Sequence, residues 1–385
     1  MAHNPDTNAV TAGRDGSQPL ATPLWATTVW SSEGLDDTAS RASSLRAPNY
    51  YGRHANPTVS QFENAIADLE GAESAMAFGS GMGAIASIVL AFCNSGSHIV
   101  AQNTLYGGTL AFLEGPCRRL GIDVTYVDPS VPGAFSAAIQ LGRTMLILAE
   151  TPSNPRLSIC NLTELGAIKG PFTVVDSTLA TPLSQRPLDH GINLVMHSAT
   201  KGIGGHNDAM LGVVAGEKDL IDALWAYGVL HGATASPYDA LNGLRGIRTL
   251  PVRLRQQSSS ALKIANVLQE HPAVSSVMYP HLASHPQYAL AKEQMGNGGS
   301  LVSFEIHGGL DAIRQMFNKL KLVHAATSFG GAETLICHPL TSTHVGLPAE
   351  MLATMGVTMG LIRLSVGLEH PDDIIAELTT ALSHH

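Results

Sequence analysis

The sequence predicts an α/β protein with an open, mostly parallel sheet of roughly seven strands and a smaller C-terminal α+β domain. Two observations favour this class. Between residues 60 and 215, short apolar runs alternate with helix-like segments, which is typical of strands joined by crossover helices. From about residue 240, this rhythm gives way to one long helical pattern. The 385 residues, 44% of them hydrophobic, are enough for two domains with a large core.

Residues 1–54 are predicted to form an extended N-terminal arm that contacts a partner subunit. Prolines interrupt this stretch, and residues 24–30 are its only strand-like piece. Such an arm needs a surface to pack on, either the core of its own subunit or a neighbour whose site it completes. Its polar beginning lacks an apolar stretch behind a basic start, so we expect no secretory signal.

Residues 55–240 form the predicted large domain, which begins with a helix. Ser60 and Glu63 have the spacing of a capping box, and the apolar face that follows stops at Gly71. The predicted strands of this domain span residues 75–78, 98–101, 124–127, 145–149, 172–175, 194–196 and 211–215.

Residues 241–385 form the predicted small domain. A long helical pattern over residues 240–268 leads into it. The predicted strands span residues 301–306, 335–337 and 361–366, and the last predicted helix spans residues 371–382.

Composition argues against several classes of function. The net charge of -9, without a basic run, disfavours a nucleic-acid partner, and no apolar run is long enough to span a membrane. The four cysteines lie far apart without CxxC spacing, so a zinc ribbon or disulfide framework is not expected and a cytoplasmic location is the default. The seventeen histidines include no HExxH motif, and we predict no metal site.

Two chemically capable residues follow neighbouring predicted strands. Asp176 comes directly after strand 172–175, and Lys201 comes shortly after strand 194–196, between Thr200 and Gly202. In a parallel sheet, both strand ends lie along one rim. Pyridoxal phosphate (PLP) needs a lysine amine for its Schiff base and an anionic partner for its pyridinium nitrogen. Taken singly, a solvated lysine and a helix-capping aspartate are the ordinary interpretation, but their combination favours PLP.

The glycine-rich run GSGMGA at residues 79–84 follows a strand and opens a helix, so it predicts a phosphate-binding cradle. The run also fits the dinucleotide pattern G-x-G-x-x-A. A dinucleotide site needs an acid about twenty residues further on, whereas the next strand ends in Gln102 and Asn103. A single phosphate, as on PLP, explains the glycines as well.

Other side chains are candidates for the same site. Tyr106 could stack on a flat cofactor and transfer a proton, although an ordinary half-buried tyrosine is the alternative. Asn154 could bind a phenolic oxygen or simply form a turn. Arg363 lies in a nearly all-apolar strand, where a substrate carboxylate or a structural ion pair would account for it. Tyr51 and Arg53 could reach a phosphate in a neighbouring subunit.

With these motifs in place, the chain resembles the Cys/Met-metabolism family of PLP enzymes. This family includes cystathionine γ-synthase, cystathionine γ-lyase and β-lyase, methionine γ-lyase and the O-acylhomoserine sulfhydrylases. The resemblance runs from about residue 24 to the C-terminus. It rests on YGRHANPT at 51–58, SGM at 80–82, ETPSNP at 150–155, HSATK at 197–201, RGIRTL at 245–250, SFGGAE at 328–333 and IRLSVGLE at 362–369.

The resemblance implies PLP-dependent transferase fold type I, the aspartate-aminotransferase type, and a homotetramer built as a dimer of dimers whose active sites are shared between subunits. It implies that Lys201 and Tyr106 are catalytic. The implied cofactor-binding residues are Gly81, Met82, Tyr106, Asn154, Asp176, Ser198, Thr200 and Lys201, with Tyr51 and Arg53 from the partner subunit. The implied residues for a small amino-acid substrate are Arg363, Ser328, Asn154 and Tyr51.

The chain departs from the family pattern at several positions that bear on the reaction, among them the three that follow. Thr327 stands where cystathionine-handling members tend to have glutamate, and Gly108 stands where methionine γ-lyases typically have cysteine. Gly202 replaces an aromatic residue after the lysine. We predict a reaction at the γ-carbon of a homoserine- or methionine-type amino acid and favour γ-elimination. The alternatives are γ-replacement, β-lysis or transamination on the same fold, and a non-catalytic binding protein.

Overall fold

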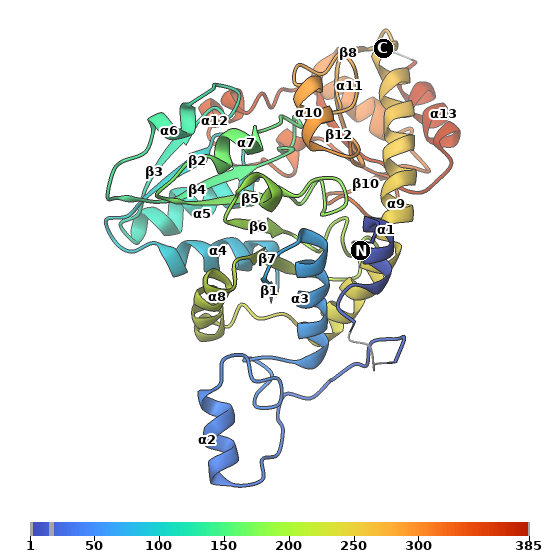
Figure 1. The fold of residues 1–385 in the computed structure, drawn as a ribbon. Coiled ribbons are helices and arrows are strands. Elements are labelled where there is room, and N and C mark those ends of the chain that lie inside the picture. The colour runs from blue at the N-terminus through green and yellow to red at the C-terminus, as the bar shows by residue number, and fades with distance from the viewer. Residues whose placement is uncertain (1–2, 15–18, 384–385) are drawn as a thin grey trace.

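The computed structural model describes residues 3–14 and 19–383, and it contains two sheets joined by one long helix (Figure 1). The larger sheet consists of β1 (Ser74–Phe78), β2 (His98–Gln102), β3 (Asp123–Val127), β4 (Thr144–Glu150), β5 (Phe172–Asp176), β6 (Leu194–His197) and β7 (Gly212–Gly216). Their order is β1-β7-β6-β5-β4-β2-β3. Only β7 runs antiparallel to its neighbours, so the predicted mostly parallel seven-stranded sheet is confirmed.

Helices cover both faces of the large sheet (Figure 1). In chain order they are α3 (Pro57–Glu70), α4 (Gly81–Phe92), α5 (Gly107–Phe112), η1 (Leu113–Cys117), α6 (Ala134–Ala137), α7 (Leu162–Gly166), η2 (Pro187–His190), α8 (Lys218–His231) and α9 (Pro237–Gln269). Alternate strand residues point to opposite faces. Leu194 and Met196 pack in the same cluster as residues of α4 and α8, whereas Val195 between them packs with residues of α3 and α9.

The small domain has its own sheet, in the order β10-β11-β12-β9-β8. Its elements are β8 (Val274–Met278), α10 (Tyr288–Gln294), β9 (Leu301–Ile306), α11 (Gly309–Phe317), β10 (His324–Ala325), β11 (Leu335–Cys337), η3 (Pro339–Thr341), α12 (Ala349–Thr354), β12 (Leu361–Ser365) and α13 (Pro371–Leu382). The three predicted strands and the last helix are confirmed. The two edge strands β8 and β10 were not predicted, because one carries two serines and the other has only two residues.

Helix α9 belongs to both domains. Leu244 and Ile247 in its first half lie in the core of the large domain, and Ile264 and Leu268 in its second half lie in the core of the small domain. The division proposed at residues 240/241 therefore falls inside one continuous helix. Because both cores include residues of α9, a movement of either domain would also displace this helix.

The start of α3 corrects one prediction. Asn56, and not Ser60, caps this helix: its Oδ1 accepts a hydrogen bond from the Thr58 amide at 2.9 Å, with Pro57 in the first helical position. Glu63 accepts a hydrogen bond from the amide of Ala77 in β1, so it is not part of a capping box. The predicted end at Gly71 is confirmed.

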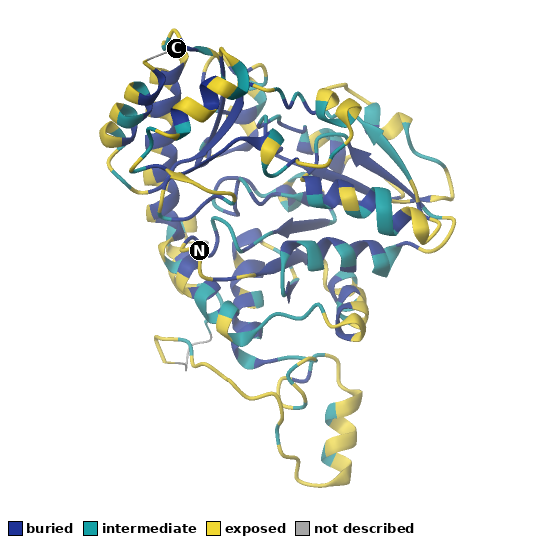
Figure 2. Ribbon diagram, turned by 180° about the vertical axis from the view of Figure 1, so that it is seen from behind, coloured by how far each residue is buried: buried dark blue, intermediate teal, exposed yellow. Residues whose placement is uncertain are grey.

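The N-terminal segment is more helical than predicted. It contains α1 (Pro5–Thr11), which packs against α3 and α9, and α2 (Leu35–Ser43), which projects with mostly exposed residues (Figure 2). The strand expected at residues 24–30 is wrong, since only an isolated bridge joins Val29 to Tyr51. Residues 1–2 and 15–18 of the predicted arm lie outside the described residues. Contact of the arm with a partner subunit stays a prediction.

Candidate active site

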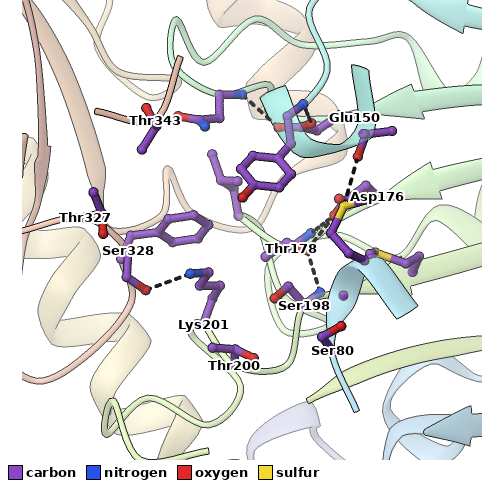
Figure 3. A pocket seen from close by; sticks show the side chains of 18 of the residues that line it. Ser80, Glu150, Asp176, Thr178, Ser198, Thr200, Lys201, Thr327, Ser328 and Thr343 are labelled. Atoms are coloured by element: carbon purple, nitrogen blue, oxygen red, sulfur yellow. Dashed lines mark hydrogen bonds between the residues drawn. The ribbon is translucent and has the colours of Figure 1, made fainter. Parts of the chain in front are cut away.

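A cavity of about 340 Å³ lies at the carboxyl ends of β4, β5 and β6, where the small domain meets the large one (Figure 3). Ligands of open α/β sheets bind at this edge. The large domain contributes the residues that follow its strands, and the small domain contributes the segment around Ser328 and the strand residue Arg363.

Lys201 projects into this cavity from the turn after β6. Its Nζ donates a hydrogen bond to Ser328 Oγ at 2.7 Å and lies 5.3 Å from the centre of the Phe329 ring. Burial, together with the positive charge of Arg363, lowers the pKa of Lys201 to about 8. A far larger fraction of this amine is therefore neutral near physiological pH than of a solvated lysine, and a nucleophile or base needs the neutral form.

Asp176 lies at the end of β5 and is held by Thr178. Its Oδ1 accepts hydrogen bonds from the Thr178 amide at 3.0 Å and from the Thr178 hydroxyl at 2.5 Å. The same hydroxyl accepts a hydrogen bond from the Ser198 amide at 2.8 Å, so Thr178 ties together the segments after β5 and β6. Burial raises the pKa of Asp176 and outweighs the hydrogen bonds from Thr178. A cationic ring nitrogen beside this carboxylate would favour its anionic form.

Glu150 is a buried acid beside the half-buried Asp176, and we did not predict a role for it. It pairs in register with Asp176 across β4 and β5. Its Oε2 accepts a hydrogen bond from the Tyr106 amide at 2.6 Å, and its Oε1 accepts one from the Asn154 amide at 2.9 Å. Burial and then the nearby charge of Asp176 hold the pKa of Glu150 well above its usual range. One carboxyl group thus fixes two loops of the cavity.

The end of the cavity beside α4 is formed by a helix N-terminus with free backbone amides. Ser80 caps α4 by accepting a hydrogen bond from the Gly83 amide at 3.0 Å, while the amides of Gly81 and Met82 have no intrahelical acceptor. A Cβ at residue 81 would lie 2.9 Å from the Cβ of Ser198, so only glycine permits this approach. Helix N-termini of this kind bind phosphate.

Thr200 lines the same end of the cavity, but its hydroxyl is already hydrogen-bonded to the backbone of Leu211. It donates to the carbonyl oxygen at 3.1 Å and accepts from the amide at 2.9 Å. A phosphate would have to share this hydroxyl with Leu211.

Arg363 is 2% exposed and has no carboxylate partner among the residues that the structure describes. Its Nη1 donates to Asn154 Oδ1 at 2.9 Å and its Nη2 donates to the Ser328 carbonyl oxygen at 2.8 Å. Its Nε is buried without a hydrogen-bond partner. The structural ion pair considered from the sequence is therefore absent from the described part of the chain, and a buried donor remains for an anionic ligand.

Tyr106 lies at the mouth of the cavity with 43% of its surface exposed, just before α5. Gly108 makes room for its ring, because a Cβ at residue 108 would lie 2.5 Å from Tyr106 Cε1. The ring thus has an open face toward the cavity, which suits stacking on a flat cofactor.

Tyr51 and Arg53 do not reach this cavity within their own chain. Arg53 donates to the Val229 carbonyl oxygen at 2.5 Å and lies 5.5 Å from the centre of the Tyr51 ring. Both residues line a separate depression on the N-terminal segment. Their predicted role in a partner subunit's site remains a proposal.

The other predicted site residues are brought together at one cavity, and several lining residues were missed. Thr178 and Glu150 lie close in sequence to predicted site residues. A polar residue two places after an acid at a strand end, as Thr178 is after Asp176, is a signal for a hydrogen bond between the two. Phe329, which lies under both Lys201 and Arg363, carries no comparable signal. Its place depends on how the small domain packs.

The donor set fits PLP. The cavity joins a helix N-terminus with free amides, a half-buried lysine of lowered pKa, a half-buried acid and an exposed aromatic ring. Among residues 3–14 and 19–383, no group of three or more His, Cys, Asp or Glu side chains is arranged to hold a metal ion. Within the same residues, no helix is both long and apolar enough to cross a membrane.

Comparisons with known proteins agree with this chemistry. A family model described as Cys/Met metabolism PLP-dependent enzyme matches residues 6–383. The L-methionine gamma-lyase of Treponema denticola is 40% identical over 370 residues, covering 94% of this chain and 92% of that protein. The O-succinylhomoserine sulfhydrylase of Pseudomonas aeruginosa is 38% identical, covering 98% of this chain and 95% of that protein.

A solved structure is similar over the whole fold. The cystathionine gamma synthase of Xanthomonas oryzae pv. oryzae, in complex with cystathionine, superposes with a TM-score of 0.93 at 36% identity. The match covers 100% of this chain and 98% of that one. The predicted fold type is therefore confirmed.

Proposed function

This chain belongs to the Cys/Met metabolism family of PLP-dependent enzymes, and we propose that it eliminates the γ-substituent of a methionine-type amino acid. With methionine and one water as substrates, the products are 2-oxobutanoate, ammonia and methanethiol. The observation that carries the proposal is the meeting of Lys201, Asp176 and Arg363 at one cavity. Each supplies one requirement of the reaction: a base, a partner for the cofactor ring and an anchor for the substrate.

PLP, when bound, supplies an aldehyde that condenses with an amino group and a ring that accepts the electron pair released at the α-carbon. We assign its phosphate to the amides of Gly81 and Met82 and to the Ser198 hydroxyl. Asp176 would face the ring nitrogen, and Tyr106 would cover the ring. The amides without an intrahelical acceptor, the half-buried carboxylate and the half-exposed phenol support these assignments.

Lys201 is proposed to remove the proton from the substrate α-carbon and to return protons later in the reaction. Its lowered pKa supports this role, because a neutral amine accepts a proton and can release it again near neutral pH. The hydroxyl of Ser328 keeps the amine oriented within the cavity. The Tyr106 phenol is proposed to donate a proton to the leaving group.

Arg363 is proposed to bind the substrate carboxylate. Asn154 and the Ser328 carbonyl oxygen hold two of its nitrogens, which fixes the plane of the guanidinium before the substrate arrives. The buried Nε, without a partner, supports an anionic ligand at this place. A fork-shaped pair would orient the α-carbon toward Lys201.

Elimination is favoured over replacement by two observations. Several relatives that cover most of the chain are named L-methionine gamma-lyase. In addition, Thr327 lines the cavity at a position where a carboxylate would be needed to bind the second amino group of cystathionine.

Replacement of the γ-substituent by a thiol is the second candidate. It is supported by the similarity to an O-succinylhomoserine sulfhydrylase and to a cystathionine gamma synthase. Both reactions share the steps assigned to Lys201 and diverge only after the leaving group departs.

A panel of γ-substituted amino acids tests the proposal. Methionine and O-acylhomoserine are each supplied with and without an added thiol, and 2-oxo acid and thioether are measured. Release of 2-oxobutanoate without thiol supports elimination. Thioether formed only with thiol, and no oxo acid without it, would overturn elimination in favour of replacement. The Lys201→Ala variant should give neither product.

We also propose that the enzyme acts in the cytoplasm as a homotetramer of two active dimers. The four cysteines are buried and free, in keeping with a reducing compartment. Tyr51 and Arg53 do not line their own chain's cavity but a separate depression, which supports a role in a second copy's site. Size-exclusion chromatography with light scattering gives the oligomeric state directly.

A further inference from the structure

Two buried polar residues of α9 lie one helical turn apart on the same face. Arg253 is 4% exposed and Gln257 is 2% exposed. Neither lines the cavity. Polar side chains this deeply buried need partners, because an unpaired buried group costs about 1–3 kcal/mol and a charged one costs more.

The partners of Arg253 are all neutral and lie on the segment that follows Lys201 or on α9 itself. Its Nη1 donates to the Gly202 carbonyl oxygen at 2.9 Å, and its Nη2 donates to the Ile203 carbonyl oxygen at 3.3 Å. The same Nη2 donates to the Gly246 carbonyl oxygen at 2.6 Å, and Nε donates to the Thr249 hydroxyl. Among the described residues, no carboxylate forms an ion pair with it.

Gln257 holds the facing segment of the small domain. Its Nε2 donates to the Gly331 carbonyl oxygen at 2.7 Å, three residues beyond Ser328. The two segments also touch each other. A Cβ at residue 330, where φ is +81°, would lie 2.6 Å from the Gly202 amide nitrogen, so glycine is needed for this approach.

One face of α9 therefore binds both segments. Arg253 is hydrogen-bonded to the segment that follows Lys201, and Gln257 is hydrogen-bonded to the segment that follows Ser328. The side chains of Lys201 and Ser328, which belong to these two segments, are hydrogen-bonded to each other at 2.7 Å. A shift of either segment by about 1 Å would break this contact and can cost about 100-fold in rate.

We propose that Arg253 and Gln257 are positioning residues that clamp the Lys201 and Ser328 segments together and so hold the Lys201 amine in the cavity. The inference deepens the proposed function and rests on it only for the assignment of Lys201 as the residue that binds PLP. The clamp acts through the backbone, and neither side chain touches substrate or cofactor.

The test compares Arg253→Met, Arg253→Lys and Gln257→Met with the controls Arg255→Met and Gln256→Met. The controls replace the same residue types at exposed positions of α9. Apoprotein is mixed with PLP across a range of pH. The rate of capture is followed by the visible absorption of the bound cofactor, and borohydride trapping with peptide mass spectrometry identifies the modified lysine.

Clamp variants should release the Lys201 amine toward solvent. The midpoint of capture should then rise from about pH 8 toward the ordinary lysine value of about 10.4. For methionine, kcat should fall by about 10–100-fold while KM changes by less than about threefold. Arg253→Lys, which keeps the charge but loses the planar fork, should give an intermediate result. A role in stability alone would lower the melting temperature and leave the capture midpoint in place.

Folded clamp variants that capture PLP with the rate and midpoint of the unmodified protein would overturn the inference. If Arg253→Met fails to fold, the result for Gln257→Met decides whether the inference holds. This variant should still fold, because it removes only one neutral hydrogen bond. Failure of the proposed function is distinguishable: the unmodified protein would then capture PLP at Lys201 without releasing 2-oxobutanoate from methionine.

Discussion

Lys201 Nζ and Ser328 Oγ form a hydrogen bond of 2.7 Å although the two residues belong to different domains. Ser328 also accepts a hydrogen bond from Arg363 through its carbonyl oxygen, and its φ of +78° is unusual for a residue with a side chain. One strained residue thus joins the proposed base to the proposed carboxylate anchor. Strain of this kind often accompanies function.

Replacing Ser328 by alanine should affect its two hydrogen-bond partners, Lys201 and Arg363, differently. The hydroxyl that orients Lys201 is lost, whereas the carbonyl oxygen that holds Arg363 remains. We expect kcat for methionine to fall by about 10–100-fold with KM changed by less than about threefold. Ser275→Ala is the control, since its hydroxyl donates to the Glu305 carbonyl oxygen away from the cavity. A rise in KM at unchanged kcat would contradict this division of roles.

The capture of PLP by the apoprotein should depend on pH through Lys201. Below its pKa the amine is protonated and has no electron pair to offer, so the rate should rise with pH and level off above about 8. With a fully solvated lysine, the rate of PLP capture would instead continue to rise up to about pH 10.4. Stopped-flow absorbance at a series of pH values measures this midpoint. A midpoint near 10 would contradict the lowered pKa of Lys201.

Replacing Arg363 by glutamine should weaken substrate binding and also change Lys201. Loss of a charge-assisted hydrogen bond of about 1.5–3 kcal/mol predicts a KM for methionine raised by about 10–100-fold. The charge of Arg363 lowers the pKa of Lys201, so its removal should move the PLP-capture midpoint above 8. Arg156→Gln is a matched control, because that guanidinium contacts the Gly356 carbonyl oxygen instead. An unchanged KM would exclude Arg363 as the carboxylate anchor.

A methyl group at residue 108 should disturb the Tyr106 ring. The added Cβ would lie 2.5 Å from Tyr106 Cε1 and 3.2 Å from Met82 Sδ, so the ring must move. We expect kcat/KM for methionine to fall by about tenfold or more in Gly108→Ala. Unfolding would not explain the loss, because alanine in a helix is more favourable than glycine by up to about 1 kcal/mol.

Gly115→Ala is the control for this substitution, because nothing lies within 4 Å of the added Cβ. Its kcat/KM should match that of the unmodified protein. Equal activity of both alanine variants would mean that the Tyr106 ring tolerates displacement.

His344 should make the protein less stable in mild acid. Burial and the charge of Arg363 lower the pKa of His344 from 6.5 to about 4. Between these values the unfolded chain binds a proton that the folded chain does not, so stability is lost as pH falls from 6.5 to 4. The loss amounts to at most about 3 kcal/mol at pH 4.

Denaturant unfolding of His344→Gln tests this assignment. The free energy of unfolding of the variant should fall less steeply between pH 6.5 and 4 than that of the unmodified protein. Other buried histidines, such as His98 and His285, also have a lowered pKa and keep part of the slope in both proteins. Parallel curves for the two proteins would contradict the role of His344.

Local pattern was sufficient for most of the fold. The seven strands of the large sheet were predicted because each is a short, mostly apolar run whose apolar residues stand next to one another along the chain. The start of α3 was missed because two signals compete there. Asn56 followed by Pro57 begins the helix one turn before the spacing of Ser60 and Glu63 suggests.

The sequence by itself determined the large sheet and the chemical residues at the ends of its strands, including Lys201 and Asp176, because strand periodicity and strand-end chemistry are local properties. Only the tertiary structure decided that Ser328 meets Lys201, that Glu150 holds the loops of Tyr106 and Asn154, and that α9 grips both sides of the cavity. These contacts join residues far apart in the chain and depend on how the two domains pack. A local sequence pattern does not specify which residues of one domain will contact which residues of the other.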